Sequence, residues 1–210
     1  GFGKTEVAMR SAFISISSGK QVIILCPSTV LSEQHYESFL ERFKSLAVNT
    51  KIINRHVNRK NKDDIVNDFN QGNVDILIGT HALFTSGINF SNTGLLVVDE
   101  EHKFGIKQKD IIKSKQENIH ILYLSATPIP RTMNFIFSGL KEFSFLHTPP
   151  TNRISIKSFL KVENLQLFKE AISREVSRGG QCFIVQNDIS KMEFLKRSIS
   201  SILPEVTIDI

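Results

Sequence analysis

The sequence lacks several features that would indicate a membrane, fibrous or disordered protein. None of its 210 residues belongs to a run approaching the ~18 consecutive apolar residues of a membrane-spanning helix. It has no internal repeat and no low-complexity segment. Hydrophobic residues make up 40% and charged residues 22% of the chain, which is typical of a soluble globular protein. We therefore expect a globular protein that does not interact with a membrane.

Cysteine is scarce: only Cys26 and Cys182 are present. Each belongs to an apolar run, VIILC or CFIV, of the kind found in buried strands. We expect both thiols to be buried and reduced, and to form neither a disulfide bond nor a metal site. This cysteine usage fits a reducing compartment, so the predicted location is the cytoplasm.

The chain also lacks an initiator methionine and a signal peptide. It begins with GFGKT, which matches only the last five residues of the phosphate-binding loop G-x-x-x-x-G-K-[ST]. We expect Gly1 to be a cut in a longer parent chain. The strand that leads into such a loop would then be missing, together with the first residues of the loop.

Basic residues exceed acidic residues by five, with 26 Lys and Arg against 21 Asp and Glu. This balance permits nucleic-acid binding but does not establish it, because many basic surfaces are simply solvated.

Short, continuous apolar runs alternate with longer helical segments over the first 147 residues. Continuous rather than alternating runs are typical of parallel strands covered on both faces, so we predict a doubly wound α/β domain. A helix is expected from Tyr36, since Phe39, Leu40 and Phe43 recur at helical spacing. The predicted strands cover residues 21–26, 49–53, 74–79, 94–99 and 120–125.

The pattern changes at HTPPTNR (147–153), where two prolines interrupt a polar stretch. We predict a first domain over 1–147, a linker over 148–162 and the start of a second, incomplete α/β domain over 163–210. In that second domain we expect helices marked by Leu165, Phe168, Ile172, Val176 and by Met192, Leu195, Ile199, Ile202, and strands over 179–186 and 206–210.

The first candidate binding motif is Gly1, Phe2, Gly3, Lys4 and Thr5. Glycines let backbone N–H groups turn around phosphates, Lys4 can meet the β- and γ-phosphate charge, and Thr5 can ligate Mg²⁺. EVAMRSAF continues as a helix, so a bound anion would lie at its N-terminus. A glycine-rich turn before a capped helix is the alternative interpretation.

The second motif is LLVVDEEH (95–102), an apolar strand that ends in acidic residues. Parallel sheets bind ligands at the carboxyl ends of their strands, so Asp99 can hold Mg²⁺ there. Glu100 can act as general base on the attacking water. The alternative is an acid-rich helix start that only complements the helix dipole.

Three further stretches follow predicted strands. SATPIPRT (125–132) places the hydroxyls of Ser125 and Thr127 at the ligand edge, although by itself the stretch would be interpreted as an ordinary strand-to-helix turn. CPSTVLSEQH (26–35) and IGTHALF (78–84) carry hydroxyls and N–H groups that can grip a nucleic-acid backbone. Helix capping by Ser28 or Thr29 explains the first equally well. For His81 and His102 we expect hydrogen bonding, because no metal-ligand spacing is present.

The order GFGKT, PSTVLSEQHY, ILIGTH, VVDEEHKFG, LSATPIPRT and GGQCFIVQND closely resembles the superfamily 2 helicases and translocases. The likeness is greatest to the bacterial transcription-repair coupling factors, with the branch-migration helicases of the RecG type as near relatives. RecG-like proteins usually have the sequence DEQH here, with glutamine at the position of Glu101, whereas this chain has DEEH. The resemblance extends over all 210 residues and implies a RecA-like P-loop NTPase lobe followed by the start of a second one.

The resemblance implies roles for individual residues. Residues Gly1–Thr5 would bind ATP, Asp99 would bind magnesium, Glu100 would activate water, and His102 in the box Asp99, Glu100, Glu101, His102 would couple to the neighbouring lobe. Pro27, Ser28, Thr29 and Gly79, Thr80, His81 would contact the DNA backbone. Ser125, Ala126 and Thr127 would link hydrolysis to DNA movement.

By the same resemblance, the intact protein would use ATP and Mg²⁺ to track along double-stranded DNA, displace stalled RNA polymerase and recruit excision-repair proteins. The segment is expected to be inactive alone, because the family's arginine finger lies in the rest of the second lobe. The departures are Lys103 in place of Arg, Ala82 in place of a basic residue and Ser125 in place of Thr. A RecG-like remodeller of forked DNA and a non-catalytic nucleotide- or DNA-binding remnant are the alternatives.

Overall fold

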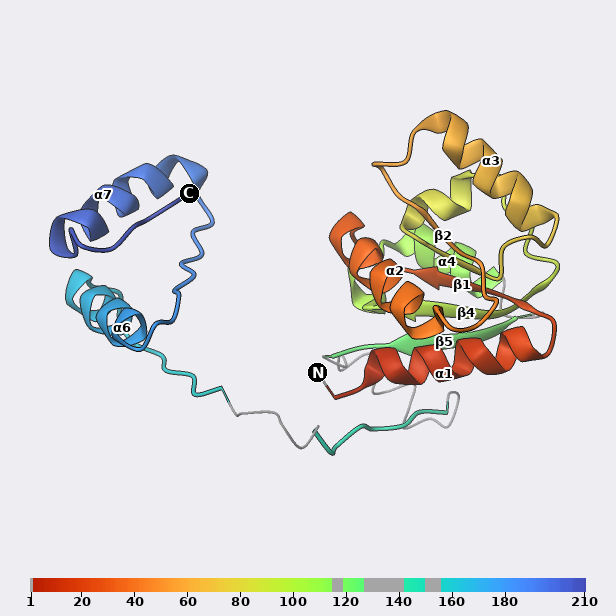
Figure 1. Ribbon diagram of the computed structural model, residues 1–210, viewed down its shortest axis with the longest axis horizontal. Helices are drawn as coiled ribbons and strands as arrows, with labels where there is room; N and C mark the ends of the chain where they lie inside the picture. Colours follow the sequence, from red (N-terminus) through yellow and green to blue (C-terminus); the bar gives the residue numbers. More distant parts are fainter. Residues whose placement is uncertain (1, 115–118, 127–141, 150–155) are drawn as a thin grey trace. The chain divides into compact units, whose positions relative to one another are not determined.

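The computed structural model describes residues 2–114, 119–126, 142–149 and 156–210 (Figure 1). The chain divides into two compact units, Gly1–Arg153 and Ile154–Ile210. The predicted linker over 148–162 falls partly outside the described ranges, so the domain boundaries of the sequence analysis stay a prediction. Among the helices in these ranges, none combines the length and the apolar character needed to cross a bilayer.

The first unit is built on a parallel five-stranded sheet with the order β2-β3-β1-β4-β5. Every strand predicted for this unit is present, with ends displaced by at most two residues, and the α/β fold class is confirmed. The strands are β1 (Gln21–Leu25), β2 (Thr50–Ile53), β3 (Ile76–Gly79), β4 (Thr93–Asp99) and β5 (His120–Leu124).

Helices cover both faces of the sheet. Helices α1 (Lys4–Ser17) and α2 (Thr29–Phe43) pack on one face, while α3 (Arg59–Asn70) and α4 (Ile106–Ser114) pack on the other. Successive side chains of a strand point to opposite faces. Within β1, Val22 and Ile24 therefore join the core under α1 and α2, and Ile23 and Leu25 join the other core.

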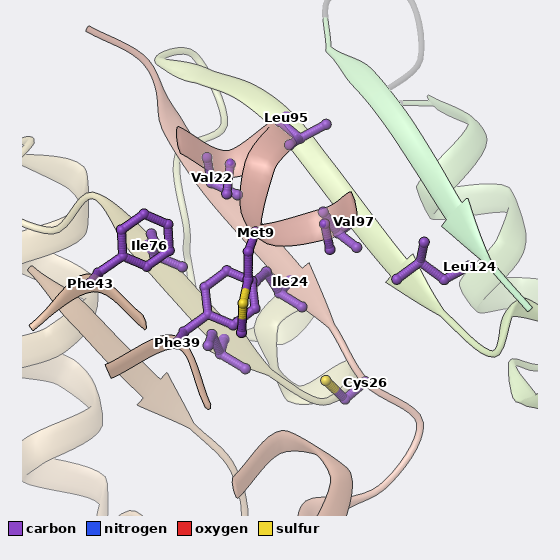
Figure 2. Close-up of a cluster of buried hydrophobic side chains, with 13 residues drawn as sticks. Met9, Val22, Ile24, Cys26, Phe39, Phe43, Ile76, Leu95, Val97 and Leu124 are labelled. Carbon is purple, nitrogen blue, oxygen red and sulfur yellow. The ribbon is translucent and has the colours of Figure 1, made fainter. Parts of the chain in front are cut away.

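Figure 2 shows the core between the sheet, α1 and α2, with Met9, Phe39 and Phe43 lying over the strand side chains. The rings of Phe39 and Phe43 have centroids 5.9 Å apart, which joins successive turns of α2. The helix predicted from Tyr36 is present but begins earlier, at Thr29, and Leu40 is exposed. Adjacent helical positions differ by about 100°, so Leu40 turns away from the face that Phe39 buries.

The second unit contains α6 (Leu165–Ser177), the short helix η3 (Ile189–Lys191) and α7 (Met192–Ile202). Both α-helices were predicted, and they share a small core of Ile172, Ile199 and Leu203. The strands predicted over 179–186 and 206–210 are absent from the described structure. A strand needs a neighbour to pair its backbone N–H and C=O groups, and in the described residues no strand lies beside either segment.

This difference also corrects the expectation for one cysteine. Cys26 is free and buried, as predicted, but Cys182 is free and exposed. Its neighbours Phe183 and Val185 are 93% and 89% exposed. An apolar run is buried only where a second layer covers it, and none of the described residues covers this one.

Candidate nucleotide and nucleic-acid site

The carboxyl ends of the parallel strands meet at one edge of the sheet. Leu25 at the end of β1 pairs with Gly79 of β3 and with Val98 of β4, and Asp99 pairs with Leu124 of β5. The segments that follow these strands therefore begin side by side. They include the predicted binding residues at 27–29, 80–81, 100–102 and 125–126.

Helix α1 begins at this edge, at Lys4. The residue before it, Gly3, has φ 90° and ψ 17°, a left-handed conformation that glycine adopts without steric cost. Its carbonyl accepts the first helical hydrogen bond, from Val7 N–H at 3.1 Å. The free N–H groups of the first turn make such a helix start suited to an anion. Phe2 is exposed, and Gly1 lies outside the described residues.

A cavity of about 170 Å³ brings the two predicted halves of the phosphate site together. Lys4 and Thr5 enter it from α1, and Asp99 and Glu100 enter it from the end of β4. Cation, hydroxyl and two carboxylates thus share one small polar space. The cavity wall is completed by a stripe of α2: Leu31, Gln34, His35 and Ser38.

Glu100 is held in an unusual backbone conformation. Its φ of 51° and ψ of 53° are left-handed, and no other non-glycine residue in the described ranges has a positive φ. Its N–H donates to the carbonyl of Leu124 at 2.9 Å, which ties the turn to the end of β5. The Nζ atom of Lys4 lies 3.9 Å from Oε1 of Glu100.

The short helix η2 (Glu101–Lys103) follows directly and completes the acidic box. Glu101 and His102 are both half-buried. Nδ1 of His102 lies 3.4 Å from Oε2 of Glu100, but the two atoms are not in hydrogen-bonding geometry. Both are buried and have no hydrogen-bond partner among the described residues. The hydrogen bond expected of His102 is therefore absent from the described structure.

The first predicted DNA-binding segment, Pro27 to Thr29, starts α2. Ser28 is the N-cap, and its Oγ accepts a hydrogen bond from Leu31 N–H at 3.3 Å. The simple capping explanation is thus observed. Ser28 is nevertheless exposed at the ligand edge, while Pro27 and Thr29 are half-buried.

The second such segment, Gly79 to His81, lies at the end of β3. Gly79 has no room for a side chain, because a Cβ atom there would lie 2.3 Å from the carbonyl oxygen of Ile53. Thr80 is buried, and its N–H donates to the same carbonyl at 3.4 Å. His81 begins the short helix η1 (His81–Thr85) and is exposed at the edge.

The third segment follows β5. Ser125 and Ala126 are exposed just beyond Leu124, at the same edge. Thr127, predicted to act with them, lies outside the described residues.

The donor set fits Mg²⁺ bound mainly by phosphates and water. Mg²⁺ takes oxygen ligands, and in nucleotide sites it uses one or two carboxylates plus the phosphates rather than a cage of protein groups. The cavity offers such oxygens on Thr5 and Asp99. Among the described residues, no group of three or more His, Cys, Asp or Glu side chains is arranged to hold a metal.

Residues 1–136 match the family model described as DEAD/DEAH box helicase. The chain belongs to the DEAD/DEAH box helicase family. This membership confirms the predicted RecA-like P-loop fold of the first unit and implies binding of a nucleotide such as ATP.

Individual relatives of this helicase chain agree with the predicted resemblance. The transcription-repair-coupling factors of Haemophilus influenzae and Escherichia coli are 45% and 43% identical over 208 and 210 residues. These alignments cover 99% and 100% of the chain but only 18% of each relative. A structure of RecG bound to a three-way DNA junction matches with a TM-score of 0.72 and 29% identity, over 96% of this chain and 27% of that one.

The sequence analysis missed the contribution of α2 to the helicase site. Leu31, Gln34, His35 and Ser38 recur at spacings of three, one and three, which places them on one helical face. Because α2 starts at the ligand edge, this spacing was a usable signal. His35 contacts Asp99, as Nε2 lies 2.9 Å from Oδ2. The thiol of Cys26 is near as well: burial, and secondly the Asp99 charge, raises its pKa far above the usual range.

Proposed function

We propose that these residues form the ATP-binding first lobe, and the start of the second lobe, of an ATP-dependent double-stranded DNA translocase. The intact protein would couple transcription to DNA repair by displacing stalled RNA polymerase and recruiting excision-repair proteins. One observation carries this proposal: Lys4, Thr5, Asp99 and Glu100 line a single cavity at the ligand edge of the sheet. The end-to-end alignment with transcription-repair-coupling factors supports it.

In the proposed mechanism, the start of α1 and the Lys4 ammonium bind the β- and γ-phosphates of ATP. Thr5 and Asp99 would hold Mg²⁺, which would supply positive charge against the phosphate oxygens. Glu100 orients a water molecule and accepts its proton as the water attacks the γ-phosphorus, while the bond to the β,γ-bridging oxygen breaks and ADP leaves. The contact between Lys4 and Glu100 keeps cation and base on the same side of the cavity.

The neighbouring segments of the edge would bind DNA. Hydroxyl and N–H groups of 27–29 and 79–81 contact backbone phosphates, which gives binding without sequence preference. Residues 125–127 link hydrolysis to movement of the DNA. The excess of five positive charges supports association with a polyanion.

The test is ATP turnover of the purified intact protein, with and without duplex DNA. We expect Lys4→Ala to lower DNA-stimulated turnover by at least about 10²-fold, because one group aimed at developing charge contributes that much or more. Lys20→Ala is the matched control. Lys20 is exposed and lies just before β1, at the end of the strand away from the ligand edge. Turnover near the unsubstituted level in Lys4→Ala would refute the phosphate-site assignment.

Related measurements distinguish two other candidate functions. ATP binding without turnover, in the presence or absence of duplex DNA, would favour a non-catalytic nucleotide-binding segment. The likeness to junction-bound RecG favours a remodeller of forked DNA. Regression of a synthetic fork by the intact protein, without displacement of a stalled RNA polymerase, would support that candidate over the coupling factor.

A further inference from the structure

Helix α2 inserts an imidazole beside the acidic pair. Nε2 of His35 lies 2.9 Å from Oδ2 of Asp99, although the two residues are 64 positions apart. The side chains are only 9% and 10% exposed. In the described structure this is the single hydrogen bond to the Asp99 carboxylate.

The buried face of α2 extends to the cavity. Phe39 and Phe43 fix the helix against the sheet from its buried face. His35 lies on the same buried face, one helical turn before Phe39, and there it lines the cavity of Lys4 and Glu100 together with Gln34 and Ser38. At this end of the buried face a hydrogen-bonding side chain contacts Asp99, at the cavity, where Phe39 and Phe43 contact the apolar core.

We propose that His35 is a positioning residue for Asp99. Its Nε2–H donates to Oδ2, which fixes the rotation of the carboxylate and leaves Oδ1 as the oxygen presented to a magnesium ion. The inference rests on the proposed function, because it concerns the aspartate assigned there to Mg²⁺. Groups that orient a metal-binding side chain typically change metal affinity or activity by about 10- to 100-fold when they are removed.

The test measures binding of the fluorescent nucleotide mant-ADP to the 210-residue chain, first in EDTA and then in a Mg²⁺ titration. We expect His35→Leu to raise the Mg²⁺ concentration for half-maximal tightening by about 10-fold or more. Its affinity in EDTA should match that of the unsubstituted chain. His35→Gln should restore most of the Mg²⁺ response, because the glutamine side-chain amide can donate to Oδ2 from a similar position.

A matched control is available in the same unit. His56 also pairs with a carboxylate, since its Nδ1 lies 2.8 Å from Oε1 of Glu33, but this pair is exposed and does not line the cavity. His56→Leu should leave the Mg²⁺ titration unchanged. Circular dichroism at the assay temperature verifies that each variant is folded.

The outcomes separate the two proposals. If Asp99→Asn does not alter the Mg²⁺ response, or the unsubstituted chain does not bind mant-ADP, the proposed metal and nucleotide site fails and the role of His35 fails with it. If Asp99→Asn weakens the response while His35→Leu does not, only the positioning role is refuted. Equal loss of affinity in EDTA and in Mg²⁺ for His35→Leu would also refute it, as a purely structural effect.

Discussion

The two cysteines lie in similar apolar segments, but one segment is a buried strand and the other is exposed. Cys26 follows the apolar strand β1, whose neighbours β3 and β4 pair with it on both sides. Cys182 lies in an equally apolar run, GGQCFIVQ, that forms no strand and is exposed. The first unit supplies both partner strands and covering helices, whereas the described part of the second unit has helices α6, η3 and α7 and no strand. Burial in this chain therefore follows from the neighbours of a segment more than from its own composition.

The largest expected effect concerns the reactivity of the two thiols. At pH 8, Cys182 should react with iodoacetamide at the rate of an exposed thiol. Cys26 should react at least about 10³-fold more slowly, because its reaction requires opening of a stable core. Burial also raises the pKa of Cys26, which lowers the fraction of its reactive thiolate further. Mass spectrometry of labelled peptides measures both rates, and comparable rates would contradict the contrast between the units.

The second prediction compares two phenylalanines. Phe39→Ala should lower the free energy of unfolding of the first unit by about 3–5 kcal/mol, because Phe39 is fully buried under α2. Phe183→Ala should change it by less than about 0.5 kcal/mol, since Phe183 is 93% exposed. Urea unfolding followed by circular dichroism gives both values. A cost above 1 kcal/mol for Phe183→Ala would reveal a cover over 181–186.

The third prediction compares two glycines with close neighbours. Gly79→Ala should cost about 1–3 kcal/mol, because the added Cβ would lie 2.3 Å from the backbone oxygen of Ile53. Gly180→Ala would bring Cβ within 2.4 Å of Oε1 of Glu175, the mobile end of a side chain. We expect that contact to relax at a cost of less than about 1 kcal/mol. Equal costs in urea unfolding would show that the edge between β2 and β3 is more adaptable than its geometry indicates.

The smallest effect is expected at the strained turn of the first unit. Glu100→Gly should raise the free energy of unfolding by about 1 kcal/mol, because left-handed strain of 1–3 kcal/mol is relieved while glycine adds flexibility to the unfolded chain. Glu101→Gly, in the next position but without positive φ, should instead lower stability. Thermal unfolding monitors both variants. Destabilisation by Glu100→Gly would mean that the side chain stabilises the fold more than its backbone strains it.

The comparison also explains how far sequence reasoning succeeds. The strands of the first unit were predictable because each is a continuous apolar run between polar turns, as in β3 and β4. An apolar run at 179–186 predicted a strand that the structure does not contain. An apolar run by itself carries no information about which strand would pair with it. Confirmed elements are thus those whose partners are also encoded in the described chain.

For the site, Lys4, Thr5, Asp99 and Glu100 could be predicted to converge, because the phosphate-loop motif and the strand end both imply the ligand edge. His35 could not be assigned in the same way. The spacing along α2 places His35 on the side toward the ligand edge, but it does not identify Asp99 as the partner, and that contact spans 64 residues. The exposure of Cys182 could not be predicted either, because it depends on whether other segments cover it.

The left-handed turn at Glu100 has a consequence for protein engineering. Consecutive side chains of a strand point to opposite sides, so Asp99 and Glu100 on a regular strand could not enter one cavity. The reversal of the backbone at Glu100 removes this alternation, and both carboxylates line the same space. A transplant of the acidic pair into another parallel sheet would therefore have to carry the kink and its anchor on Leu124, and not the two letters alone.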